Sequence, residues 1–142
     1  MLVLAADHGG FELKNRIGEW LRKNGYEYID CGTNSPDSVD YPVYARLAAQ
    51  KILSGECERG ILCCGTGIGI CMAANRIKGI RAATCESELC AEMTRRHNDA
   101  NILCLGGRTT GEAHAIELVK IFLTTPFDGG ERHLRRIRML DE

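Results

Sequence analysis

Residues 60–69, with the sequence GILCCGTGIG, give the clearest indication of the fold. The first half of this segment, Gly60–Cys64, is a short apolar run, which is typical of a strand buried on both faces. Its second half, Gly65–Gly69, holds glycines that permit a tight turn, and a helical pattern continues to about Arg76. A buried strand that passes through a tight turn into a helix is the repeating unit of a parallel α/β sheet.

More apolar runs alternate with helical patterns on either side of this unit. The predicted strands are Leu2–Ala6, Tyr26–Asp30, Gly60–Cys64, Ile80–Cys85 and Ile102–Leu105. The predicted helices are Phe11–Asn24, Tyr41–Leu53, the segment to about Arg76, Ser87–Arg96, a helix that opens at Thr109–Glu112, and a short one at Glu131–Leu140. This alternation predicts a doubly wound five-stranded parallel sheet with helices on both faces, a Rossmann-like three-layer sandwich. With 142 residues and no linker or repeat, we expect one domain over residues 1–142.

Charge and hydropathy exclude several classes of protein. Eighteen basic and nineteen acidic residues give a net charge of -1, which favours neither nucleic acid nor an anionic membrane as a partner. No apolar stretch approaches the length of about 18 residues that a membrane span needs, and the N-terminus does not read as a secretion signal. We therefore expect a cytoplasmic protein.

The eight cysteines lack the spacing of a disulfide or zinc framework. No two of them form a C-x-x-C pair, and no histidine stands at zinc spacing from them. Several lie inside apolar runs, where a free thiol behaves as a small hydrophobic side chain. We therefore expect most of these thiols to be reduced core residues.

Chemically active side chains follow the predicted strands at the edge where such sheets bind ligands, beyond the strands' carboxyl ends. The first strand is followed by Asp7-His8-Gly9-Gly10, the third by the glycine turn, the fourth by Glu86-Ser87 after Cys85, and the fifth by Gly106-Gly107-Arg108. An acid, an imidazole, a thiol, a hydroxyl and a guanidinium are therefore expected on one rim.

The glycine turn Gly65–Gly69 leads directly into a predicted helix. Backbone N–H groups and the positive end of the helix dipole then point to one place, which can bind phosphate or hold an enediolate oxygen. A tight turn without a ligand is the alternative. A dinucleotide site is not supported, because the fingerprint needs a glycine where this chain has Ile70.

Cys64 ends the third predicted strand, immediately before those N–H groups, which favour a thiolate. The alternative is that Cys64 is one more core cysteine, like Cys63. Adjacent strand residues face opposite sides, so at most one of the two points into the cleft, and position favours Cys64.

Two further groups of residues lie outside this rim in the sequence. Arg132 and Arg136 share a helical face and are spaced for one phosphate, although a solvated basic helix has the same pattern. His97, Asn98 and Asp99 precede the fifth strand, so they should lie at the opposite edge from Cys64 of their own subunit. If His97 is catalytic, we expect it to serve the site of a neighbouring subunit.

The chain resembles the B-type ribose-5-phosphate isomerases, whose wider family includes allose-6-phosphate and galactose-6-phosphate isomerases. The matching segments are residues 7–11, 13–14, 40–42, 60–70, 73–76, 79–82, 96–101, 106–108 and 130–136. The resemblance implies an enzyme that interconverts ribose 5-phosphate and ribulose 5-phosphate. It also implies a homodimer or tetramer with sites at the subunit interface, and neither a metal nor an organic cofactor.

The resemblance also implies roles for individual residues. Cys64 would move a proton between C1 and C2 through a cis-enediol, Thr66 and His97 would help to open the furanose ring, and Asp7 would handle protons at the sugar hydroxyls. Gly65, Gly67, Ile68 and Gly69 would hold the enediolate oxygen, Asn98 would contact the sugar, and Tyr41 would form a wall. His8, Arg108, Arg132 and Arg136 would bind phosphate, with the last helix, about residues 131–140, completing that site.

Two positions qualify the resemblance. One branch of the family uses a glutamate just after the glycine turn, but this chain has Ile70, so the cysteine mechanism is favoured. Glu131 interrupts the usual Gly-Gly-Arg-His run.

The alternatives to a ribose-5-phosphate isomerase are an allose or galactose 6-phosphate isomerase, a non-catalytic sugar-phosphate-binding module, and a thiol-based redox protein.

Overall fold

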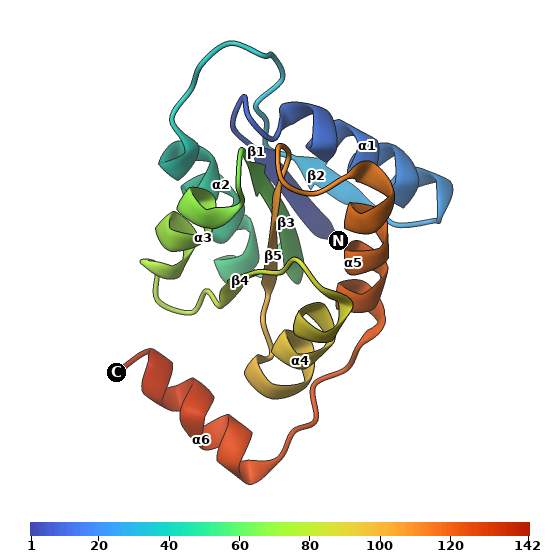
Figure 1. Cartoon of the computed structure of the whole chain (residues 1–142). Helices are drawn as coiled ribbons and strands as arrows, with labels where there is room; N and C mark the ends of the chain where they lie inside the picture. Colours follow the sequence, from blue (N-terminus) through green and yellow to red (C-terminus); the bar gives the residue numbers. More distant parts are fainter.

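Five parallel strands form the middle layer of the computed structural model, which describes residues 1–142 (Figure 1). They are β1 (Leu2–Ala6), β2 (Tyr28–Asp30), β3 (Arg59–Cys64), β4 (Ala82–Thr84) and β5 (Ile102–Gly106). The strand order across the sheet is β2-β1-β3-β5-β4. Every neighbouring pair is parallel, so the prediction of a doubly wound five-stranded parallel sheet is confirmed.

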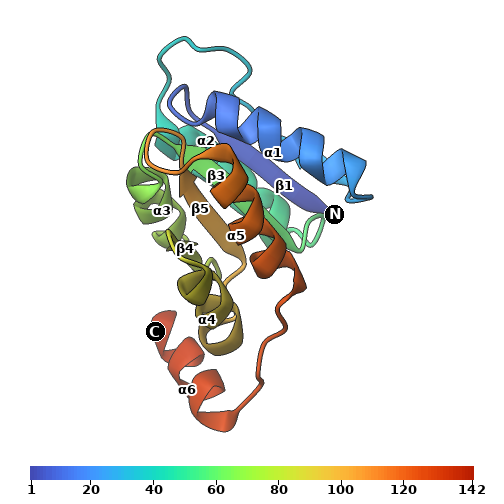
Figure 2. The same cartoon turned by 45° about the vertical axis from the view of Figure 1, so that its right-hand side comes forward.

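Helices cover both faces of the sheet. The helices of the chain are α1 (Phe11–Lys23), α2 (Tyr41–Leu53), α3 (Ile68–Asn75), α4 (Glu88–Asn98), α5 (Glu112–Thr124) and α6 (Glu131–Leu140), and the first five of them form the covering layers. Buried side chains of α1, α4 and α5 pack in one cluster, and those of α2 and α3 pack in another. Figure 2 shows α1 and α5 on the near side of the sheet, with α2 behind it. No helix has both the length and the apolar character required to span a membrane.

The alternation of side chains along β3 explains the two clusters. Ile61 and Cys63 pack against the layer that contains α1 and α5, whereas Leu62 and Cys64 pack against the layer of α2 and α3. Successive residues of a strand point to opposite faces, so a strand covered on both sides is apolar throughout.

Two strands, β2 and β4, begin later in the structure than the sequence predicts. The prediction of a strand from Tyr26 is wrong, because the Tyr26 N–H donates to the Leu21 carbonyl and completes the end of α1. The prediction of a strand from Ile80 is also wrong, because the Ile80 N–H donates to the Ile77 carbonyl in a turn. Local turn closure therefore replaces strand pairing at both places.

Helix α6 lies outside the layers of the sandwich. Figure 1 places it at the opposite end of the molecule from the turns that follow β1, β3 and β5. None of its side chains is buried, and its C-terminal end is tied by the Gly79 N–H, which donates to Asp141 Oδ1 at 3.1 Å. Packing against the hydrophobic core of this chain therefore does not hold α6 in its position.

Candidate active site

Backbone contacts join the turns after β1, β3 and β5 into one rim at the carboxyl edge of the sheet. The Gly107 N–H donates to the Cys64 carbonyl at 2.8 Å. The Arg108 N–H donates to the Gly65 carbonyl at 2.9 Å. A Cβ atom on Gly9 would lie 2.9 Å from the Gly65 nitrogen, closer than side chains tolerate, so the β1 turn can approach the β3 turn only with glycine there.

The Cys64 thiol faces the start of α3. The Gly67 N–H donates to its Sγ at 3.2 Å, and the residue is 5% exposed. Gly67 has φ 78°, a left-handed conformation that favours glycine, and a Cβ atom there would lie 2.9 Å from the Leu105 carbonyl carbon. This turn geometry aims an N–H at the sulfur, where it stabilises negative charge.

Cys63 is separated from this environment by the sheet. It lies in the opposite cluster, and burial raises its pKa well above the usual value of a thiol. The structure therefore places Cys64, and not Cys63, beside the glycine turn, as position along the strand predicted.

Asp7 and His8 lie in the turn after β1 with their orientations fixed. Asp7 Oδ1 accepts from the N–H groups of Gly9 at 2.8 Å and Gly10 at 3.2 Å. His8 Nδ1 accepts from the Val39 N–H at 3.2 Å, so the neutral ring carries its proton on Nε2. His8 and Arg108, two of the four residues predicted to bind phosphate, line one hollow of about 220 Å³.

Tyr41 packs against Gly69, at the end of the glycine turn. Its ring packs on Gly69 so closely that a Cβ atom at that position would lie 2.9 Å from Cζ. Thr66 Oγ1 accepts from the Ile68 N–H at 3.3 Å. The structure thus brings together ten predicted residues, which we call the Cys64 group: Asp7, His8, Tyr41, Cys64, Gly65, Thr66, Gly67, Ile68, Gly69 and Arg108.

The other predicted residues form a separate group on α4 and α6, which we call the His97 group: His97, Asn98, Arg132 and Arg136. His97, Asn98 and Arg136 line one hollow of about 260 Å³. Because α4 leads into β5, this group lies near the amino ends of the strands, away from the glycine turn (Figure 1). A single chain therefore does not bring the two groups together, and the predicted separation of His97 from Cys64 is confirmed.

The end of β4 reaches the glycine turn through Thr84, whereas the predicted hydroxyl of Ser87 has another partner. Strand β5 lies between β3 and β4, so β4 is at the edge of the sheet. Ser87 caps α4 by accepting from the Cys90 N–H at 3.2 Å. Cys85 is a core residue, and burial raises its pKa to about 12. Cys85 and Ser87 therefore serve as a core residue and a helix cap.

The structure also adds two residues that the sequence interpretation missed. The backbone of Val39, in the loop before α2, fixes the His8 ring. The Thr84 hydroxyl donates to the Gly67 carbonyl at 2.8 Å, so it supports the peptide whose neighbouring N–H reaches Cys64. Neither residue has a sequence signal, because both contacts join segments that are distant in the chain.

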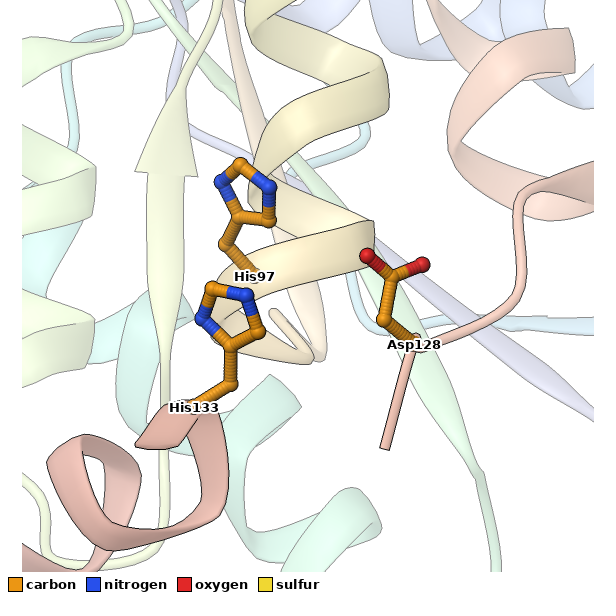
Figure 3. Close-up of side chains that lie close together, drawn as sticks. All are labelled: His97, Asp128 and His133. Carbon is orange, nitrogen blue, oxygen red and sulfur yellow. The ribbon is translucent and has the colours of Figure 1, made fainter. Parts of the chain in front are cut away.

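One cluster of side chains has the composition of a metal site. Ligand atoms of His97, Asp128 and His133 lie within 4.8 Å of one another (Figure 3). The two imidazole rings are stacked with 11° between their planes, so their in-plane lone pairs do not converge on one ion. Arg96 binds the Asp128 carboxylate at 3.3 Å. The geometry therefore favours a stacking contact over ion binding.

Comparisons with known proteins show the family to which the chain belongs. Residues 2–140 match the model of the family described as Ribose/Galactose Isomerase. Ribose-5-phosphate isomerase B of Escherichia coli is 42% identical over 139 residues, covering 98% of this chain and 93% of that protein. The crystal structure of a Thermotoga maritima ribose 5-phosphate isomerase matches with a TM-score of 0.97 at 52% identity, covering 99% and 96% of the two chains. Clostridium thermocellum ribose-5-phosphate isomerase B gives a TM-score of 0.96 at 48% identity, with 99% and 94% covered.

Proposed function

The chain belongs to the ribose/galactose isomerase family, and we propose that it interconverts ribose 5-phosphate and ribulose 5-phosphate with Cys64 as the base. It is a sugar-phosphate isomerase, and relatives named for ribose 5-phosphate favour the pentose as its substrate. The observation that carries the choice of base is the Cys64 thiol held against the Gly67 N–H, at the start of α3.

In the proposed reaction Cys64 moves one proton between two neighbouring carbons. The thiolate removes the proton from C2 of the open-chain aldose, and negative charge develops on O1. N–H groups of Gly65–Gly69 and the start of α3 stabilise that oxygen. Asp7 transfers the hydroxyl proton between the two oxygens of the cis-enediol, and Cys64 returns its proton to C1. A base positioned in this way contributes roughly 10²–10⁴-fold to the rate.

The furanose ring must open before this transfer can occur. Opening takes one proton from the anomeric hydroxyl and gives one to the ring oxygen. We assign these two transfers to His97 and Thr66, while Asn98 contacts the sugar. Because His97 and Thr66 lie in separate groups within one chain, the assignment requires residues of two subunits at one site.

A symmetric homodimer satisfies that requirement. An isologous interface places the His97 group of each copy against the Cys64 group of the other, giving two equivalent sites. Apolar side chains beside the glycine turn are exposed, among them Ile68 at 51% and Met72 at 65%. Surface of this kind is typical of protein interfaces. Helix α6, which buries no side chain in its own chain, would cover the partner's site.

The substrate phosphate would lie between His8 and Arg108 of one subunit and Arg132 and Arg136 of the other. Arg136→Ala should raise KM for ribose 5-phosphate about ten- to hundredfold, with kcat within about threefold, because phosphate contacts act in ground and transition states alike. Arg135→Ala is the matched control, since Arg135 is an exposed neighbour on α6 that does not line the hollow. A large loss of kcat at unchanged KM would contradict the assignment to phosphate.

The substrate itself is tested by NMR with purified protein and ribose 5-phosphate, with allose 6-phosphate and galactose 6-phosphate in parallel. We expect conversion to ribulose 5-phosphate and preference for the pentose. Conversion of a hexose phosphate alone would overturn the proposed substrate but keep the chemistry. Failure with all three sugars would overturn the proposed function and favour a sugar-phosphate-binding module.

A further inference from the structure

The imidazole of His97 is held by an aromatic neighbour on another helix. His97 is exposed in the last turn of α4. Its ring stacks on that of His133 in α6, with centroids 4.5 Å apart and planes inclined by 11° (Figure 3). This contact joins two helices that otherwise touch little, and one of them is not anchored in the core.

The surroundings of His133 favour its neutral form. Desolvation lowers its pKa, and so do the positive charges of His97, Arg132 and Arg136, whereas Asp128 acts in the opposite direction. Arg96 engages the Asp128 carboxylate, which moderates that opposing effect. A neutral ring can stack on His97 without charge repulsion and without competing for its proton.

A general acid or base must hold its nitrogen within hydrogen-bond reach of the substrate. An exposed histidine has several rotamers, and fixing one of them before the substrate arrives removes part of the entropic barrier. The His133 ring lies flat against His97, so it restricts the plane of that imidazole and leaves the ring edge open to a ligand.

We propose that His133 is a positioning residue that orients His97 for opening of the sugar ring in the partner subunit's site. The inference rests on the proposed function. In this role His133 neither transfers a proton nor binds phosphate, since it acts through the stacking surface of its ring. It should therefore be replaceable by another flat ring without nitrogen atoms.

Two substitutions in the full-length protein test the proposal. His133→Ala should lower kcat for ribose 5-phosphate roughly three- to tenfold with KM within about twofold, whereas His133→Phe should recover wild-type kcat to within about twofold. Unchanged kcat in His133→Ala would overturn the proposal. Equal losses in both variants would show that the ring nitrogens are needed, and a shared rise in KM would indicate a phosphate contact, so either result would also overturn it.

A second readout separates ring opening from proton transfer. Ribulose 5-phosphate is an open chain, because the C5 oxygen that would close its ring is esterified. Cys64 can therefore exchange a C1 hydrogen of ribulose 5-phosphate with D2O, and no ring-opening step is needed. His133→Ala should keep this exchange, followed by NMR, near the wild-type rate while it slows conversion of ribose 5-phosphate. A parallel loss of exchange would mean that α6 has a general structural role. Wild-type protein that neither converts nor exchanges would instead contradict the proposed function.

Discussion

Replacing Cys64 with alanine is expected to lower kcat for ribose 5-phosphate at least ~10²-fold, because the reaction loses the base that moves the proton. The fold should persist. Cys64 is 5% exposed and loses one heavy atom, a change that costs on the order of 1 kcal/mol of stability. Initial rates by NMR, together with circular dichroism and thermal unfolding, measure both effects.

Two other thiols supply matched controls. Cys63→Ala changes the adjacent residue, which faces the opposite layer, and should leave kcat within a few-fold. Cys71→Ala removes a thiol whose pKa is lowered to about 6, chiefly by a hydrogen bond with Cys104. Alkylating reagents would modify Cys71 as well, so point substitution and not chemical labelling identifies the base. Near-normal turnover by Cys64→Ala would refute its role, as would an equal loss in Cys71→Ala.

Mixing two inactive variants should restore activity if the site is shared between subunits. A dimer of one Cys64→Ala chain and one His97→Ala chain has one site with both defects and one with neither. Random exchange should therefore recover about a quarter of wild-type activity, since about half of the dimers are hybrid and each has one intact site. Rates are measured after the variants are unfolded and refolded together.

The matched control mixes Cys64→Ala with Asp7→Ala, whose side chain belongs to the same Cys64 group. Each site of that hybrid has one defect, so no recovery is expected. Native mass spectrometry establishes that hybrids form in both mixtures. If hybrid dimers of Cys64→Ala and His97→Ala form but are inactive, the proposal of a site shared between subunits is refuted. Recovery of activity in the control mixture would show that activity returns for another reason.

The sequence predicted most of the fold because the signals were local. Short apolar runs such as Gly60–Cys64 alternate with helical patterns, and this alternation is sufficient to predict a parallel sheet covered on both faces. The rule that ligands bind beyond the carboxyl ends of the strands then placed Asp7, His8, Cys64 and Arg108 on one rim. The roles of these residues in catalysis stay predictions until the variants are measured.

The sequence by itself therefore determined the layers of this protein and the edge that carries the Cys64 group. The tertiary structure added that β5 separates β3 from β4 and that the Ser87 hydroxyl caps α4. It also decided that His133 stacks on His97 and that the Thr84 hydroxyl supports Gly67. Periodicity reports which face of an element is buried, but these contacts join residues distant in the chain, so their energies depend on how the elements pack and not on any local pattern.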